Sequence, residues 1–498
     1  MLLDATDDVS YEGLFGTVNA EKIAMTTNRL RTHPYGELYQ RIRHYSALLM
    51  QSKIPQDGCV SFLLSDPFEM AALAIATLRL RRVLFPISPN MASQEAIVNM
   101  LGRARPHLFV HDLPDLNEGL KRKCQYIAAP ADAPEHLGVD LDTFMRDVKQ
   151  EDGMALIMHS SGSTGTPKMV YYNHSNLMKL FEYKIRHFGF SVESTCMTCS
   201  AGYHLNGFYM AMCTLLQGGH IINSFEITGT PQYELIRAHR PSILVLYPDL
   251  LVDFTHQLDR RNEGAPYIRC LITGGDTVPV NSLRRFFELT GRLPITMIGM
   301  TECPTYMGNN TNLEKLGSFG HTPLPGYEIR LIHTCEEAGG GTVGEVELRS
   351  LAASSGYLAE DLTGGVTQQQ DGWIQTGDIL RRDAEGYYWF VSRRKDVVLR
   401  NAITIPLSEI EDALLSYDKV ENACVVVMES RDFGLTNYDR QITAFVTFRQ
   451  DADLPGLRRF VANNLADFKN PDQIHVVTSF PRNASGKIDK NALIALHT

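Results

Sequence analysis

The sequence lacks the features that would place the protein in a membrane, outside the cell or on nucleic acid. No apolar run approaches the ~20 residues that a membrane-spanning helix needs. The first eight residues are acidic and lack the basic start and apolar core of a secretion signal. No long basic run offsets the net charge of −10, which argues against a nucleic-acid-binding surface. We therefore expect a cytoplasmic protein with no membrane span and no nucleic-acid partner.

Cysteine is scarce and does not form a metal-binding pattern. The chain has nine cysteines, an odd number that favours reduced thiols in a cytosol. Cys196 and Cys199 have CxxC spacing, which occurs in zinc and redox sites. There is no second CxxC to complete a zinc site, and free cysteines tend to be buried. We expect this pair to be buried strand residues.

The order of apolar segments predicts an α/β protein. The length of 498 residues allows two to four domains, and a hydrophobic content of 44% is ordinary for a globular protein. Helix-like and strand-like segments alternate, which indicates parallel sheets covered by helices on both faces. The first of these segments are a helix over Tyr35–Gln51, a strand over Val60–Leu64, a helix over Phe68–Leu80 and a strand over Val83–Ile87; the pattern recurs around Ile221, Ile243–Leu246 and Cys270–Thr273.

The pattern of predicted elements changes in the last third of the sequence. After Leu331, short strands and glycine-rich turns predict a small β-rich lobe that ends near Val391. The last ~100 residues alternate between strands and helices, which predicts an independent α+β unit. Its expected elements are helices over Leu407–Leu415 and Leu454–Leu465, and strands over Ala423–Met428 and Ala444–Phe448.

A segment rich in glycine and hydroxyl groups follows the strand-like residues 155–158. Its two glycines permit close backbone approach to anionic oxygens, while its hydroxyls and single lysine add donors and charge. A flexible loop is the alternative, but the strand before it and the Pro-Lys ending favour a phosphate-binding loop. It is not the P-loop of kinases, since the Gly-Lys-Ser/Thr ending is missing. The candidate nucleotide-binding residues are Ser160, Ser161, Gly162, Ser163, Thr164, Gly165 and Lys168.

This loop resembles the phosphate loop of the adenylate-forming superfamily, which includes acyl- and aryl-CoA synthetases, luciferase and the adenylation domains of nonribosomal peptide synthetases. Four further motifs follow in the family's order: Gly299–Glu302, Thr376–Asp378, Ser392–Asp396 and Ser485–Asp489. The resemblance implies a large N-terminal domain over residues 1–394 with two doubly covered sheets and the β-rich lobe. It implies a small, mobile α+β lid over residues 395–498, with Lys395 at the hinge.

The resemblance also assigns roles around ATP. Glu302 would hold Mg²⁺ beside the hydroxyl of Thr301, since Mg²⁺ prefers few protein oxygens plus phosphates. Asp378 would accept hydrogen bonds from the ribose hydroxyls, and Arg393 would reach the ribose or phosphates. Lys487 would bridge the acid and the α-phosphate as the catalytic lysine. Without the resemblance, these would be a surface acid, a turn residue and solvated side chains.

The remaining motif residues would line the adenine and the acid. Gly274, Gly275 and Asp276 match the segment that passes along both, although glycine pairs also mark ordinary turns. The family often has an aromatic residue where this chain has Ile298, and an aliphatic side chain would stack less strongly on adenine.

The segment Tyr203–Gly207 resembles one found in members that activate acyl and aryl acids. It has no acidic residue to hold an α-ammonium group, which favours a plain carboxylic acid over an amino acid. A structural core histidine is the competing reading for His204. The expected substrate contacts are His204, Asn206, Met210, Gly299 and Met300, with residues near Pro304–Met307.

The acyl acceptor is less constrained by the sequence. Family members usually have glycine in the loop after the hinge, whereas this chain has Asn401 and Ala402, whose side chains would crowd a pantetheine tunnel. We expect the enzyme to use ATP to form an acyl-adenylate and to pass the acyl group to CoA or to a free-standing carrier protein, either of them supplied in trans. The alternatives are transfer to an amine or another non-thiol acceptor, and a non-catalytic nucleotide-binding relative.

Overall fold

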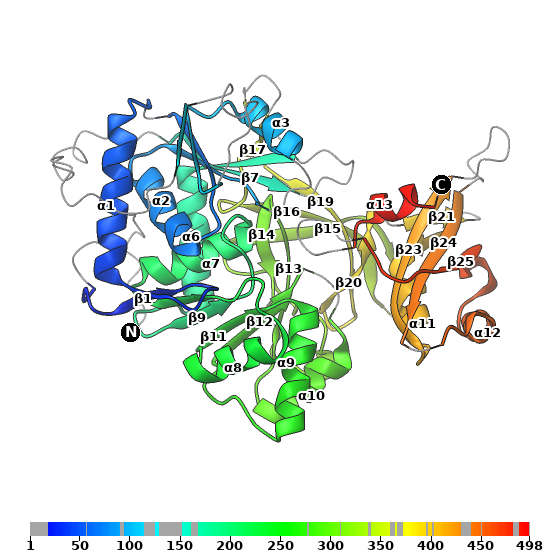
Figure 1. Cartoon of the computed structure of the whole chain (residues 1–498). Helices are drawn as coiled ribbons and strands as arrows, with labels where there is room; N and C mark the ends of the chain where they lie inside the picture. Colours follow the sequence, from blue (N-terminus) through cyan, green and yellow to red (C-terminus); the bar gives the residue numbers. More distant parts are fainter. Residues whose placement is uncertain are drawn as a thin grey trace. The chain divides into compact units, whose positions relative to one another are not determined.

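The computed structural model of the chain is drawn in Figure 1. It describes residues 18–55, 57–89, 94–113, 125–128, 152–160, 168–275, 278–308, 310–336, 340–358, 364–365, 372–394, 397–400, 403–429, 440–449, 451–481 and 488–497. Contacts divide the chain into two compact units. One comprises residues 1–329 and 348–374, and the other comprises residues 330–347 and 375–498.

The first sheet of the larger unit is mostly parallel and has the strand order β14-β13-β12-β11-β9-β10-β1-β2. Its parallel strands are β1 (Ile23–Thr26), β9 (Thr195–Thr198), β10 (His220–Asn223), β11 (Ile243–Leu246), β12 (Cys270–Gly274) and β13 (Ile295–Met300). The edge strands β2 (Thr32–Pro34) and β14 (Cys303–Met307) are antiparallel to their neighbours. The carboxyl ends of the parallel strands therefore meet at one edge, where ligands commonly bind in open α/β sheets.

The second sheet has the order β18-β17-β8-β7-β4-β3-β5-β6. Its parallel strands are β3 (Cys59–Leu63), β4 (Val83–Pro86), β5 (Leu108–His111), β6 (Gln125–Ala128) and β7 (Met154–Ser160). At one side of the sheet, each strand pairs antiparallel with the next. These strands are β8 (Lys168–Asn173), which follows β7, then β17 (Gly356–Leu358) and β18 (Gly364–Gly365). The pairing of β17 with β8 brings together residues that are almost 190 positions apart in the chain.

Helices cover both faces of the first sheet. Figure 1 shows α8 (Gly229–His239), α9 (Pro248–Arg261) and α10 (Val280–Thr290) on the side away from α7 (Leu205–Leu216). The apolar face of α8–α10 joins strand residues such as Met197, Leu244 and Leu271 in one buried core. The other described helices of this unit are α1 (Tyr35–Gln51), α2 (Pro67–Arg79), α3 (Gln94–Ala104), α6 (His174–Phe188) and the 3-10 helix η1 (Leu313–Lys315).

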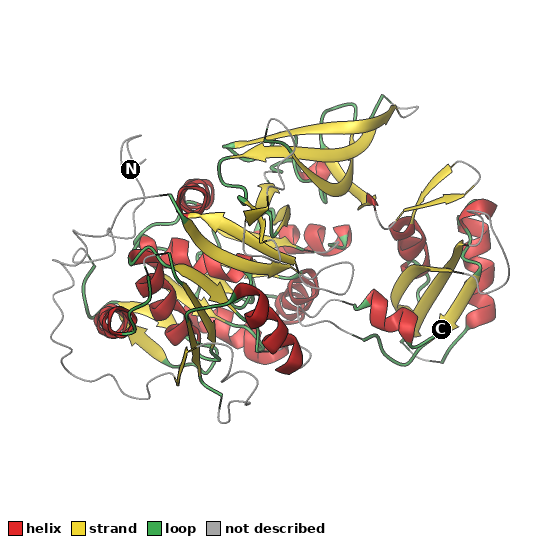
Figure 2. Ribbon diagram, turned by 90° about the horizontal axis from the view of Figure 1, so that it is seen from above, coloured by secondary structure: helices red, strands yellow, loops and turns green. Residues whose placement is uncertain are grey.

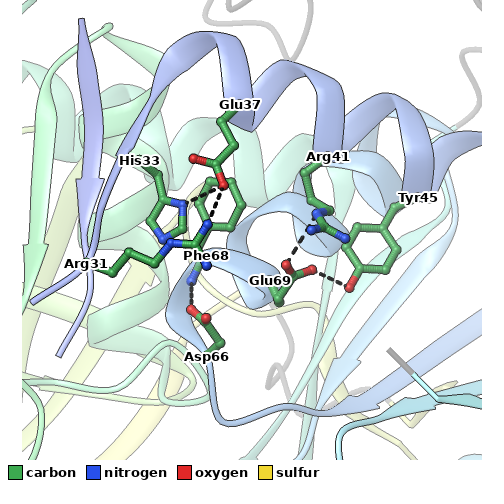
Figure 3. A network of polar contacts seen from close by, with 8 residues as sticks. All are labelled: Arg31, His33, Glu37, Arg41, Tyr45, Asp66, Phe68 and Glu69. Atoms are coloured by element: carbon green, nitrogen blue, oxygen red, sulfur yellow. Dashed lines mark hydrogen bonds and ion pairs between the residues drawn. The ribbon is translucent and has the colours of Figure 1, made fainter. Parts of the chain in front are cut away.

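Polar contacts join the start of α2 to α1 (Figure 3). Asp66 caps α2 by accepting a 2.9 Å hydrogen bond from the backbone N–H of Phe68. Glu69 accepts a 2.6 Å hydrogen bond from the phenol of Tyr45 and lies 3.3 Å from Arg41 Nε. Burial raises the pKa of Glu69 despite these two partners. The network fixes α2 against α1.

The smaller unit contains most of a four-stranded sheet and a separate α/β layer (Figure 2). The four strands are β15 (Tyr327–Glu336), β16 (Thr342–Ser350), β19 (Ile374–Arg382) and β20 (Tyr388–Arg393), of which β19 and β20 pair antiparallel. The other elements are β21 (Val397–Arg400), β22 (Ile403–Pro406), α11 (Leu407–Leu415), β23 (Val420–Glu429), β24 (Arg440–Phe448), α12 (Leu454–Asn464), η3 (Asp467–Lys469), β25 (Gln473–Val476) and α13 (Lys490–Ala495).

The sheet β23-β24-β25 is buried on both faces. Val425 packs with α11 and α12, whereas its neighbours Cys424 and Val426 pack with Leu493 of α13. Successive strand residues point to opposite faces, so one apolar run serves two cores. This is the α+β unit that the sequence predicts.

The α/β fold class, with several mixed sheets and a small C-terminal domain, is confirmed. The contact grouping assigns much of the β-rich lobe, through β15, β16, β19 and β20, to the smaller unit. The boundary between residues 394 and 395 remains a prediction. None of the helices within the described ranges is long and apolar enough to cross a membrane.

Candidate active site

The carboxyl ends of β12 and β13 carry two of the motifs that the sequence singles out. Gly274 ends β12 and pairs with Met297 of β13. A Cβ at Gly274 would lie 2.4 Å from the carbonyl oxygen of Met297, so the close pairing requires glycine. Gly275 follows with φ +87° and is exposed. The backbone at this edge is therefore open to a ligand.

Glu302 lies just beyond β13 and is almost completely buried, with 7% of its surface exposed. Its carboxylate accepts a 2.5 Å hydrogen bond from the phenol of Tyr357, and its backbone carbonyl accepts one of 2.7 Å from Ser354 N–H. A buried carboxylate is costly unless it is hydrogen-bonded, and these contacts fix its direction. Glu302 is therefore a preorganised acid rather than a surface acid.

Tyr357 is a site residue that the sequence analysis missed. It lies on β17 opposite Val170 of β8, and the ring centroid is 5.0 Å from Nζ of Lys168 at the start of that strand. Burial and the charge of Glu302 raise the pKa of the phenol well above its usual value. Tyr357 thus links the end of the candidate phosphate loop to the candidate metal ligand, a pairing that no local pattern signals.

Thr301 is held through its backbone. Its carbonyl accepts a 2.6 Å hydrogen bond from Tyr172, whose ring is fully buried on β8. The hairpin from β13 to β14 is also pinched, because a Cβ at Gly299 would lie 2.1 Å from Thr305 N. Met300 is half-buried, and Ile298 is buried with 8% of its surface exposed. These contacts restrain the backbone of the turn that carries Glu302, which we call the acidic turn.

The expected acid-binding residues lie at the start of α7. His204 is the N-cap of this helix, and its ring centroid lies 4.8 Å from that of Tyr203 and 6.2 Å from that of His159. Burial lowers the pKa of His159 to about 4, so its imidazole is neutral at pH 7. Asn206 has a buried Oδ1 without a hydrogen-bond partner in the described part of the chain. Tyr203, His204, Asn206 and His159 therefore form a polar cluster at the start of α7.

Behind these residues, α7 is apolar. Gly207 and Phe208 line a small cavity together with Met25, Phe62 and other apolar residues. Met210 is completely buried. Its expected contact with a substrate remains a prediction.

Asp378 and Arg393 face each other across β19 and β20 in the smaller unit. Arg393 Nε lies 3.1 Å from Asp378 Oδ1, and only 1% of the Asp378 surface is exposed. The backbone N–H of Asp378 donates to the hydroxyl of Thr376, across Gly377 with φ +72°. The pairing of β19 with β20 brings the two residues together, and their ribose role remains a prediction.

Several predicted site residues lie outside the described residues. They are Ser161, Gly162, Ser163, Thr164, Gly165, Asp276, Lys395, Asn401, Ala402 and Lys487. Ser160 is the last residue of β7, directly before this loop.

Both cysteines of the CxxC pair are buried, as predicted, but only the first lies on a strand. Cys196 lies on β9, Cys199 follows that strand, and both are buried. Burial raises the pKa of each thiol to about 12, so neither is a thiolate near neutral pH.

Comparison with known proteins matches both parts of the chain to family models. One described as AMP-binding enzyme covers residues 16–358, and one described as AMP-binding enzyme C-terminal domain covers residues 409–487. The medium-chain fatty-acid–CoA ligase of Escherichia coli (strain K12) is 24% identical over 498 aligned residues, which cover 94% of this chain and 87% of the ligase.

Two solved structures share the fold. The amide bond synthetase from Marinactinospora thermotolerans has a TM-score of 0.81 and 21% identity, with coverage of 99% of this chain and 100% of that one. The O-succinylbenzoate coenzyme A synthetase from Bacillus subtilis, in complex with ATP and magnesium ion, has a TM-score of 0.78 and 22% identity, with coverage of 95% and 96%. Both likenesses extend over almost the whole chain.

Proposed function

This chain belongs to the AMP-binding enzyme family within the adenylate-forming superfamily, and on that basis we propose that it is an ATP-dependent ligase of carboxylic acids. It forms an acyl-adenylate and pyrophosphate, then transfers the acyl group to a pantetheine thiol. The observation that supports this most strongly is the carboxylate of Glu302, buried and fixed by Tyr357 at the carboxyl edge of a parallel sheet. Lys168 lies against the same phenol ring.

The first half-reaction joins two anions. A carboxylate oxygen of the acid attacks the α-phosphorus of ATP, and the bond to the β-phosphate oxygen breaks to release pyrophosphate. The barrier is largely electrostatic, so fixed donors and positive charge near the phosphates lower it. We assign the phosphates to the loop from Ser160 to Lys168 and the attacking carboxylate to Lys487.

Glu302 fits a magnesium ion that is held mainly by phosphate oxygens. Mg²⁺ takes one or two carboxylates and fills its remaining positions with phosphates and water. Within the described ranges, no group of three or more His, Cys, Asp or Glu side chains could hold a metal by itself. When bound, the ion would offset the negative charge of the leaving pyrophosphate. Tyr357 would keep the carboxylate turned toward it.

Asp378 would bind the ribose, and Arg393 would orient it. A single carboxylate can accept hydrogen bonds from both ribose hydroxyls. The ion pair with Arg393, 3.1 Å from Nε to Oδ1, would limit the rotation of the Asp378 carboxylate. Gly274, Gly275 and Asp276 would pass along the adenine, with Ile298 nearby in place of an aromatic residue.

The acid would lie at the start of α7. His204 and Asn206 supply polar groups there, and Tyr203–Gly207 contains no acidic residue to hold an ammonium group. A plain carboxylic acid therefore fits better than an α-amino acid. The Escherichia coli relative is named for a medium-chain fatty acid, which agrees with this class. Gly299, Met300 and Met210 would complete the pocket.

In the second half-reaction the thiolate attacks the acyl carbonyl and AMP leaves. We assign the thiol to CoA or to a carrier protein. We also propose that residues 395–498 rotate about Lys395 between the first and the second half-reaction. We place the reaction in the cytoplasm. Transfer to an amine is the competing reaction, because a protein of this fold is an amide bond synthetase.

Mass spectrometry of the products tests the acceptor. The enzyme is incubated with ATP, Mg²⁺ and a panel of acids, in parallel with CoA, a phosphopantetheinylated carrier protein or hydroxylamine. The proposal predicts an acyl thioester with CoA or the carrier protein for at least one acid. Because hydroxylamine captures an acyl-adenylate directly, hydroxamate formation without any thioester would mean adenylation without transfer to a thiol, which favours the non-thiol-acceptor alternative.

A further inference from the structure

Lys184 is a lysine in the interior of the protein, on helix α6. None of its surface is exposed, whereas lysine is almost never fully buried unless it is paired. Nζ donates a 2.6 Å hydrogen bond to the carbonyl of Thr305 and one of 3.1 Å to the phenol oxygen of Tyr327. It also lies 4.7 Å from the centroid of the Tyr327 ring.

No carboxylate within the described residues pairs with Lys184. The titratable groups that face it are the thiols of Cys213 and Cys303, the phenol of Tyr327 and the imidazole of His187. Burial lowers the pKa of Lys184 to about 7, although both thiols oppose that shift. A buried cation without a counter-ion is costly, so stability alone does not explain this lysine.

The carbonyl that Lys184 binds belongs to a strained residue. Thr305 has φ +50°, a left-handed conformation that is a genuine outlier for a β-branched residue. Such strain persists only where the surroundings over-determine it, and it clusters at functional sites. Thr305 faces Gly299 across the hairpin, where no Cβ fits.

Two tyrosines complete the support of this segment. Tyr209 Oη lies 3.2 Å from the hydroxyl of Thr305, and Tyr327 donates a 3.3 Å hydrogen bond to the carbonyl of Pro304. Both phenols are buried, which raises their pKa above the ordinary phenol value, and both are neutral at pH 7. Lys184 donates the side-chain hydrogen bond that holds the Thr305 carbonyl, and its amine retains donors in either protonation state.

We propose that Lys184 is a positioning residue that holds Thr305 in its left-handed conformation and thereby orients Glu302 and the adjoining wall of the acid pocket. The effect on catalysis rests on the proposed function; the effect on the backbone of residues 299–307 does not. Glu302 lies three residues before Thr305 on the same pinched hairpin, so a change in the Thr305 backbone moves the acid as well.

The test uses Lys184→Met, which keeps the length of the side chain and removes the donors. Lys179→Met is the matched control, because Lys179 lies on the same helix with 41% of its side chain exposed. The rate of acid-dependent pyrophosphate exchange is measured for both variants. We expect Lys184→Met to lower kcat at least about tenfold with little change in KM for ATP, and Lys179→Met to match the wild type.

A double-mutant cycle separates positioning from general support of the core. Glycine adopts positive φ without strain, so a glycine at position 305 should not need the hydrogen bond from Lys184 to keep this conformation. The loss caused by Lys184→Met should therefore shrink to less than about threefold when Thr305 is replaced by glycine. Tyr327→Phe, which keeps the ring and removes the hydroxyl, replaces Lys184→Met in this cycle if the latter does not fold.

Amide hydrogen exchange of residues 299–307 in the substrate-free protein gives a readout that needs no activity. Faster exchange in Lys184→Met than in Lys179→Met supports the proposal, even if no acid supports turnover by the wild type. Unchanged exchange in this segment overturns it, as does an activity loss that is equally large with Thr305 and with glycine at 305.

Discussion

The phenol of Tyr357 donates a 2.5 Å hydrogen bond to the buried carboxylate of Glu302, from a strand that lies 55 residues further along the chain. This contact joins three features of the site. Glu302 is the candidate magnesium ligand, β17 carries the tyrosine, and Lys168 of the neighbouring strand β8 lies against the tyrosine ring. Substitutions at these residues therefore test the proposed function of the site.

Tyr357→Phe should slow adenylation while leaving the fold intact. A hydrogen bond to a charged group contributes about 1.5–3 kcal/mol, and here it directs the carboxylate rather than holding the core. We therefore expect the kcat of pyrophosphate exchange to fall about tenfold or more. Tyr171→Phe is the matched control, because Tyr171 is a half-buried tyrosine on β8, and it should retain the wild-type rate of pyrophosphate exchange. Equal rates for the two variants would contradict the role of Tyr357.

Glu302→Gln should make exchange strongly dependent on magnesium. The amide keeps the shape of the side chain and its hydrogen bond from Tyr357, but it removes the negative charge that Mg²⁺ prefers. We expect at least about a hundredfold lower rate at low Mg²⁺, with partial recovery as the concentration is raised. Glu314→Gln replaces an exposed acid on η1 and serves as the control. A normal magnesium dependence of Glu302→Gln would remove this residue from the metal site.

The stability of the protein should rise with pH because of Lys184. Its folded-state pKa of about 7 lies below the ordinary lysine value of 10.5, so the unfolded chain binds more protons between these values. Over this window the wild type should gain up to about 1.4 kcal/mol per pH unit relative to Lys184→Met. Chemical denaturation at pH 7, 8 and 9 measures the difference. Parallel pH profiles for the two proteins would show that the lysine does not titrate there.

Lys395→Pro should uncouple the two half-reactions. Proline fixes φ, so it would restrict rotation at the predicted hinge. Single-turnover measurements should show a larger loss in thioester transfer than in adenylate formation. The hinge assignment fails if both steps slow by the same factor.

Much of the fold could be predicted because local periodicity determines it. The helices over Tyr35–Gln51 and Leu407–Leu415 have the predicted bounds, and the strand expected at Val60–Leu64 is shifted by one residue to Cys59–Leu63. In the two helices the apolar residues follow the helical period, whereas the strand is a continuous buried run typical of a parallel sheet, so neighbouring residues carry enough information.

The tyrosine and lysine that support the acidic turn could not be predicted in the same way. Tyr357 reaches Glu302 only because β17 pairs with β8, a non-local pairing that local patterns do not reveal. Position 184 shares the apolar face of α6 with Leu180 and Phe181, but the residue type alone would place a lysine at the surface, because lysine is mostly exposed. Its burial follows from Tyr327 and the Thr305 carbonyl, which are more than 120 residues away.

The most direct test of the account is the acid-dependent exchange of labelled pyrophosphate into ATP, measured over a broad panel of carboxylic acids for the wild type and for Lys487→Ala. We predict exchange with at least one plain carboxylic acid by the wild type, and its loss in Lys487→Ala with ATP binding largely retained. Wild-type protein that binds ATP but shows no exchange with any acid would contradict the claim that this chain forms acyl-adenylates.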